Sequence, residues 1–221
     1  YWRAASTKLK SIVEQDKYSD VTLKHKIAIG KPFEELIEEI NKINPDLIVM
    51  GTNGSSGLSE WLIGSNTEKV VRYANCPVLS IPHQLDVSII NKIVFALNGA
   101  KNEKNAIEAI EEVRKSVDAK LYLLWVNTPH IIESEQVKEE ILDGIAKQNG
   151  LENYEVFVRK NITAEHGILN FANEIEADLI AMPTNSRKGL AYLFSGSLAE
   201  DIVNEAVLPV WTVSIANKNK K

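Results

Sequence analysis

The sequence contains an internal repeat, which limits the chain to folds built from two similar halves. The segment Asp46-Leu-Ile-Val-Met-Gly-Thr-Asn53 is nearly repeated, 132 positions later, as Asp178-Leu-Ile-Ala-Met-Pro-Thr-Asn185. At the same spacing and without a gap, Gly64-Ser65 matches Gly196-Ser197. Ungapped matches over about 35 residues indicate two copies of one structural unit.

The second copy has the element pattern of an α/β fold. Short apolar runs predict strands, and apolar residues at helical spacing between them predict helices. The predicted strands are 92–97, 119–126, 154–159, 178–182 and 209–215, and the predicted helices are 103–117, 134–148, 164–176 and 197–206. Strands that alternate with helices imply a parallel sheet that is covered on both faces.

The first copy supplies the later elements of this pattern. Its predicted helices are 2–14, 32–43 and 67–74, and its predicted strands are 22–29, 46–50 and 78–81. The strand, helix and strand predicted within 91–132 have no counterpart in it. We therefore expect a first domain at 1–85 that lacks its first β-α-β and a complete second domain at 90–217. We also expect either that the chain is a fragment or that an opening segment lies outside the given sequence.

Composition and charge argue against several classes of function. The 221 residues include 25 basic and 30 acidic side chains, with a net charge of −5, so nothing attracts the chain generally to nucleic acid or to an anionic membrane. No apolar run approaches the roughly 20 residues of a membrane span. One cysteine and four scattered histidines show no metal-ligand spacing. A lone thiol fits a reducing compartment, and we expect a cytoplasmic protein.

A glycine-rich loop in the first copy offers groups that suit a phosphate. A predicted strand ends at Met50, Gly51 and Gly54 follow, and Gly64-Ser65 opens the next helix. Glycine lets the backbone approach a ligand closely, and a helix N-terminus presents unpaired N–H groups with a positive dipole end. Together these features form an anion site of the kind that binds phosphates.

Helix capping offers a structural explanation for part of the same loop. Ser65-x-x-Glu68 and Ser197-x-x-Glu200 both have the pattern of a capping box, which needs no ligand. The loop is not a Walker loop, because no Gly-Lys-Ser/Thr follows, and its glycine spacing is not that of the dinucleotide fingerprint. On the residues alone, phosphate binding and capping therefore remain equally open.

The loop resembles a known family signature. Gly51-x2-Gly54-x9-Gly64-Ser65 is similar to the nucleotide signature of the universal stress protein family, as are its flanks, 46–51 and 76–79. The resemblance extends over both halves. It implies two tandem Rossmann-like domains of the adenine nucleotide alpha hydrolase-like type, each with parallel strand order 3-2-1-4-5. It also implies that the halves pair through their last strands, with Val78–Ile81 beside Val210–Val213, and that the ligand lies at the carboxyl ends of the strands.

The resemblance further implies a ligand and the residues that would hold it. Members of the ATP-binding branch hold ATP with this loop, so the expected ligand is ATP or another adenine nucleotide, with or without Mg²⁺. The nucleotide-binding residues that it implies are Met50, Gly51, Gly54, Gly64, Ser65, Asn66 and Thr67. A weaker second site would consist of Asn98, Gly196 and Ser197, in a half where Pro183 and Ser186 replace the first two loop glycines.

Three functions of different kinds compete. The first is a nucleotide-binding stress-response or signalling module. The second is a dimerisation or scaffold module of the same family that binds no nucleotide, in which the two halves, or two chains as a homodimer, associate through their last strands. The third is an adenine nucleotide hydrolase, which is disfavoured because the sequence shows no nucleophile motif, acid-base pair or metal ligands. We therefore predict no catalytic residues and no enzyme activity, with neither nucleic acid nor membrane as a partner.

Overall fold

The computed structural model describes residues 2–52, 65–82, 84–100, 103–129, 134–184 and 196–214. The chain divides into two compact units, Tyr1–Lys42 and Ile43–Lys221. The first unit contains α1 (Trp2–Val13), a short 3-10 helix (Asp16–Tyr18) and nearly all of α2 (Pro32–Ile43), so its two predicted helices are confirmed. No helix in the described residues is long and apolar enough to cross a membrane.

The strand predicted at 22–29 is wrong. Residues 22–29 have no regular secondary structure, and several of their apolar side chains are exposed, with Ile29 at 86%. The alternating pattern marks residues that could form a strand, but a strand persists only where a neighbour pairs with its backbone. Among the described residues, no strand pairs with this segment.

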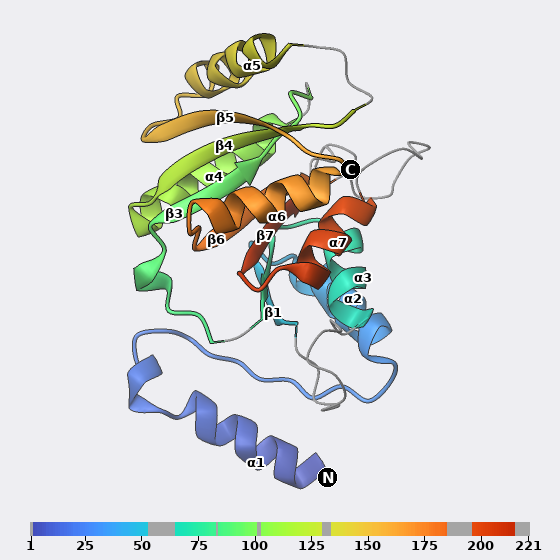
Figure 1. Ribbon diagram of the computed structural model, residues 1–221. Helices are drawn as coiled ribbons and strands as arrows, with labels where there is room; N and C mark the ends of the chain where they lie inside the picture. The colour runs from blue at the N-terminus through green and yellow to red at the C-terminus, as the bar shows by residue number, and fades with distance from the viewer. Residues whose placement is uncertain are drawn as a thin grey trace. The chain divides into compact units, whose positions relative to one another are not determined.

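The second unit is built on one seven-stranded sheet of order β1-β2-β7-β6-β3-β4-β5 (Figure 1). Every neighbouring pair is parallel except β2 and β7. The strands are β1 (Ile48–Gly51), β2 (Val78–Ile81), β3 (Lys92–Ala96), β4 (Lys120–Asn127), β5 (Tyr154–Lys160), β6 (Leu179–Thr184) and β7 (Val210–Ser214). The helices of this unit are α3 (Ser65–Tyr73), α4 (Lys104–Val117), α5 (Glu135–Gln148), α6 (Ala164–Glu174) and α7 (Gly196–Glu205), with a short 3-10 helix at Val87–Ile89.

The order of the whole sheet differs from the predicted 3-2-1-4-5 because the halves share one sheet. Strands β1 and β2 of the first half are added beyond β7, the last strand of the second half. Within the second half, counted from β3, the strands still follow the order 3-2-1-4-5. The predicted α/β class and the pairing of the halves through their last strands are both confirmed.

Strands β2 and β7 meet around a local two-fold relation. The antiparallel register pairs Val78 with Thr212, Leu79 with Trp211 and Ser80 with Val210. Leu79 and Trp211 occupy equivalent positions in the repeat, 132 residues apart, and they lie directly opposite each other. Equivalent residues that face each other place the two-fold axis between these two side chains.

Helices cover the two faces of the second half of the sheet. In Figure 1, α6 lies in front of the sheet and α4 behind it. The main core joins strands β3, β4, β6 and β7 to α4 and α5, and its fully buried members include Phe95, Ile110, Leu123 and Leu142. The first half of the chain adds Leu79 and Leu85 to the edge of this core.

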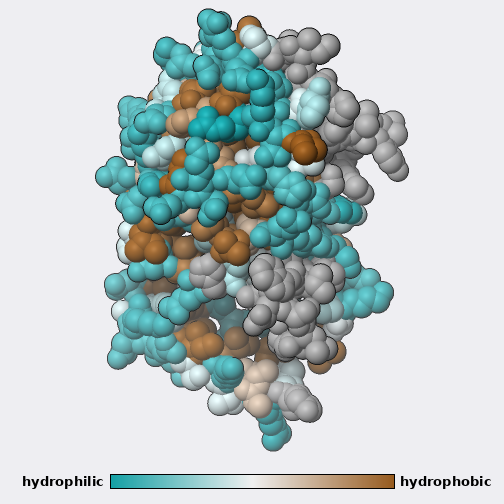
Figure 2. Space-filling model, viewed as in Figure 1, coloured by the Kyte–Doolittle hydropathy of each residue, from teal (hydrophilic) through white to brown (hydrophobic). Residues whose placement is uncertain are grey.

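Strand β1 is less protected than its counterpart β6. Val49 is 55% exposed, whereas Ala181 at the equivalent position of β6 is fully buried. Leu47 is 45% exposed and its equivalent, Leu179, is 1% exposed. The difference follows from pairing, because β6 lies between β7 and β3 while β1 pairs with β2 alone among the described strands. Figure 2 shows a face of the molecule that is mostly hydrophilic, with hydrophobic patches between the hydrophilic side chains.

Candidate functional site

The end of β1 and the first turn of α3 are held together by a side-chain hydrogen bond. The Thr67 hydroxyl donates to the Gly51 carbonyl at 3.3 Å, and Thr67 is only 2% exposed. On the other side, the Thr52 N–H donates to the Ile81 carbonyl at 3.0 Å and continues the pairing of β1 with β2. The carboxyl end of β1 and the first turn of α3 are therefore adjacent in the fold.

The described residues of this loop leave room at Gly51. A Cβ built on Gly51 would meet no atom of the described residues within 4 Å. Met50, which precedes Gly51, and Asn66, in the first turn of α3, are both half-buried. The resemblance implied that the Thr67 hydroxyl would bind the phosphates, whereas in this structure it donates a hydrogen bond to the Gly51 carbonyl.

Several predicted site residues lie outside the described part of the chain. Gly54 and Gly64 are not described. Ser65 begins α3, and Gly196 and Ser197 begin α7, but the side chains of the two serines are not described. The structure therefore places the two ends of the first-half loop and not its middle.

In the second half, the side chain and the backbone N–H of Asn98 both form hydrogen bonds within the turn that follows β3. Its Oδ1 accepts from the Ala100 N–H at 3.2 Å, and its backbone N–H donates to Glu103 Oε1 at 3.2 Å. Gly99 holds this turn with φ of +72°, and a Cβ there would lie 2.7 Å from the Trp125 ring. The turn after β3 is thus closed by groups of the protein itself.

Glu103 is a residue at this end of the sheet that the sequence patterns did not single out. It is 2% exposed, and its Oε2 has no hydrogen-bond partner within the described part of the chain. Burial raises the pKa of Glu103 to about 7, although backbone N–H groups of Asn98, Ala100 and Gly99 partly oppose the increase. A glutamate at the start of an amphipathic helix is ordinarily solvent-exposed, so no sequence signal marks this carboxyl as buried.

Two glutamates that we interpreted as capping residues contact the opposite half. Glu200 of α7 accepts a bidentate pair of hydrogen bonds from the Arg72 guanidinium of α3, with Arg72 Nε at 2.5 Å from Oε1. Glu68 of α3 accepts from Asn204 Nδ2 of α7 at 2.9 Å. The repeat relates Glu68 to Glu200 and Arg72 to Asn204, so the two contacts are equivalent across the two-fold relation. Capping alone therefore does not account for these carboxylates.

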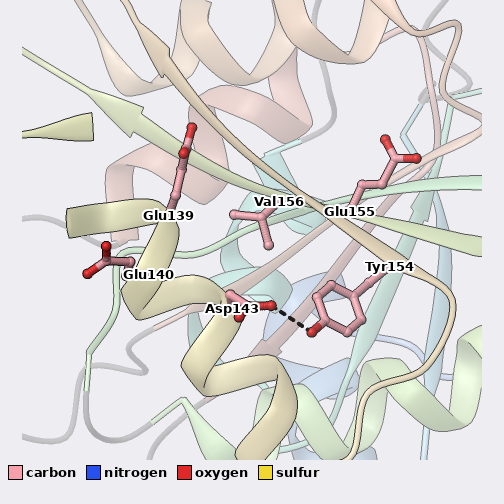
Figure 3. A pocket seen from close by; sticks show the side chains of 6 residues that line it. All are labelled: Glu139, Glu140, Asp143, Tyr154, Glu155 and Val156. Atoms are coloured by element: carbon pink, nitrogen blue, oxygen red, sulfur yellow. Dashed lines mark hydrogen bonds between the residues drawn. The ribbon is translucent and has the colours of Figure 1, made fainter. Parts of the chain in front are cut away.

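An open groove between α5 and β5 does not suit a phosphate. Its volume is about 530 Å³, and its lining includes the carboxylates of Glu139, Glu140, Asp143 and Glu155 (Figure 3). The Tyr154 hydroxyl donates to Asp143 at 2.9 Å, and this hydrogen bond is drawn in the figure. Four carboxylates repel an anion, so a nucleotide phosphate is not expected in this groove.

The comparisons with known proteins agree with the fold and with the repeat. The chain matches the universal stress protein family over residues 3–82 and 90–214, and it therefore belongs to that family. Universal stress protein MJ0531 of Methanocaldococcus jannaschii is 38% identical over 73 residues, which are 33% of this chain and 43% of that relative. The chain thus spans less than half the length of this curated relative.

Solved structures show the same architecture. A universal stress protein from Archaeoglobus fulgidus DSM 4304 aligns with a TM-score of 0.77 and 21% identity, covering 97% of this chain and 79% of that one. This likeness shows the fold. Universal stress proteins solved with cAMP and with dAMP align with TM-scores of 0.47 and 0.43, which are too low for a comparison of ligand sites.

Proposed function

We propose that this chain binds ATP or another adenine nucleotide through the first-half loop, as a non-catalytic stress-response or signalling module. The observation that carries the proposal is the position of the glycine signature in the fold. It begins where β1 ends at Gly51 and finishes where α3 begins at Ser65. A helix N-terminus beside the carboxyl end of a parallel strand offers N–H groups to a phosphate.

The second half supports the proposal by contrast. Pro183 stands where the first half has Gly51, and proline has no N–H to offer a ligand. The turn after β3 is closed by Asn98 and Glu103, and the buried carboxyl of Glu103 lies at the end of the sheet where a phosphate would approach. Both features favour the first half as the site.

Calorimetric titration with ATP tests the proposal. We expect the parent chain to bind about one equivalent of ATP, and the double variant Gly54→Val/Gly64→Val to lose this binding while it keeps the circular dichroism of the parent. Valine blocks the close approach of backbone to phosphate that glycine permits. Absence of ATP binding in the parent, or unchanged affinity in the folded variant, would contradict the proposal.

The contacts between the halves favour a second function, a dimerisation or scaffold module without nucleotide. The pairing of β2 with β7 and the Arg72–Glu200 ion pair join the halves without a ligand. In this alternative the loop glycines serve the turn alone, and the Gly54→Val/Gly64→Val variant would change the free energy of unfolding but no binding property.

A further inference from the structure

A histidine and two glutamates from different helices converge on the outer side of α6 and α7. Glu165 and His166 belong to the first turn of α6, and Glu205 is the last residue of α7. One carboxylate oxygen of each glutamate and one ring nitrogen of His166 all lie within 4.8 Å of one another. Glu205 lies 39 positions beyond His166 in sequence, so the pattern of residues along the chain gave no sign of the group.

The imidazole of His166 is oriented by the residue that caps its helix. Thr163 Oγ1 accepts from the His166 backbone N–H at 3.2 Å and lies 3.0 Å from ring Nδ1. A histidine that ligates a metal through one ring nitrogen usually engages the other with an oxygen atom in this way. The contact leaves Nε2 of the exposed ring available to a ligand.

Within the described part of the chain, the two glutamates have no basic side chain as an ion-pair partner: no lysine or arginine there pairs with Glu165 or Glu205. Oxygen atoms of the two carboxylates lie within 4.8 Å of each other. Like charges this close repel, and a divalent cation between them would relieve this repulsion.

We propose that Glu165, His166 and Glu205 bind a divalent first-row transition metal such as Zn²⁺ on the α6–α7 surface. The imidazole nitrogen decides the class of metal, because Mg²⁺ and Ca²⁺ are held by oxygen ligands whereas nitrogen ligands suit Zn²⁺, Co²⁺ and Ni²⁺. Three protein ligands leave a coordination position for water. The site is independent of the nucleotide loop, and it departs from our expectation that the chain holds no metal ligands.

Titration of the metal-free chain with Zn²⁺, without nucleotide, tests this site. We expect one equivalent to bind, with at least about tenfold weaker binding in His166→Ala and in Glu205→Gln. His25→Ala, which removes an exposed histidine far away in sequence, should bind as the parent does. An excess of Mg²⁺ should not displace Zn²⁺, and Co²⁺ in its place should give a visible spectrum that His166→Ala changes.

Both variants alter exposed residues, and circular dichroism establishes that they remain folded. The proposal is overturned if the parent binds no Zn²⁺, if the His166 and Glu205 variants bind as tightly as the parent, or if Mg²⁺ competes equally. Because the titration contains no nucleotide, failure here is distinct from failure of ATP binding.

Discussion

The Glu103 carboxyl, directly before α4, is deeply buried, and its Oε2 has no hydrogen-bond partner among the residues that the structure describes. In water a carboxyl group is ionised at neutral pH, but loss of hydration favours its neutral form. The pKa of about 7 in the folded chain lies above the ordinary carboxyl value of 4.5, so between these two pH values the folded state holds a proton that the unfolded state has released. Stability from this group is therefore fully present below pH 4.5 and is lost as pH rises through 7.

We predict that Glu103→Gln removes this pH dependence. Glutamine keeps an oxygen for the Asn98 N–H but cannot ionise. Relative to the parent, the free energy of unfolding of the variant should increase by about 3 kcal/mol between pH 4.5 and pH 8, as measured by urea denaturation at each pH.

The matched control is Glu111→Gln in the same helix. Burial opposes ionisation of Glu111, but the Arg114 guanidinium, bound at 2.7 Å, lowers its pKa overall. Its stabilisation is present above the unfolded pKa and lost in acid, so the pH trend of this variant should have the opposite sign. Parallel pH profiles for the parent and Glu103→Gln would refute the assignment of Glu103.

Sequence patterns indicated which residues meet at the end of β1 and the start of α3, but not which polar side chains are buried or brought together by helix packing. The repeat and the signature pointed to Gly51 and Thr67, and the structure brings these two residues into contact. The same patterns did not indicate the burial of Glu103 or the position of His166 beside Glu205. Burial and proximity of this kind depend on how helices pack, and helix packing is not encoded in local spacing.

Among the elements, α3 and α7 form the polar part of the contact between the halves. The Arg72 and Glu200 side chains are 27% and 10% exposed, and their bidentate geometry favours a strong pair. The Glu200 interaction raises the pKa of Arg72, which agrees with stabilisation of the charged pair.

A double-mutant cycle with Arg72→Ala and Glu200→Ala should therefore give a coupling energy of about 1–2 kcal/mol in the free energy of unfolding. The comparison pair is Lys104 and Glu108, whose exposed side chains are 3.6 Å apart within α4. That cycle should give no more than about 0.5 kcal/mol. Equal coupling in the two cycles would mean that the Arg72–Glu200 pair does not help to join the halves.

The elements themselves were largely predictable, with one instructive failure. The helical spacing of apolar residues predicts amphipathic helices such as α2 and α4, and the predicted ends of these helices agree closely with the structure. Segment 22–29 has the alternation of a strand but forms none. Alternation can be recognised within one segment, but a strand forms only when a second segment pairs with it. The sequence therefore predicts a strand well only where its partner strand is also identified.

For the whole molecule, the resemblance to the family predicted how the halves join. Equivalent last strands that meet antiparallel produce a two-fold relation, and the register of Leu79 opposite Trp211 shows it. The common sheet follows from that pairing, because two equivalent edges satisfy each other's hydrogen bonds. The weaker protection of β1 agrees with the sequence pattern, which gives the first half no counterpart of β3, and among the described strands β1 pairs with β2 alone.

The β1–α3–β2 segment of the first half corresponds to β6–α7–β7 of the second, but the two differ in sequence in the loop that would meet a nucleotide. Gly64 and Gly196 are equivalent positions in the repeat; Gly64 directly precedes α3 in sequence, and Gly196 begins α7. If a ligand binds in the first half alone, its affinity should change on substitution of Gly64 and not on substitution of Gly196.

Calorimetric titration of ATP into the parent, Gly64→Val and Gly196→Val tests this central claim most directly. We predict that Gly64→Val weakens ATP binding at least about tenfold, while Gly196→Val binds as the parent does, because the nucleotide lies on the first-half loop. Equal affinities in all three proteins, or loss of binding in Gly196→Val alone, would contradict the account.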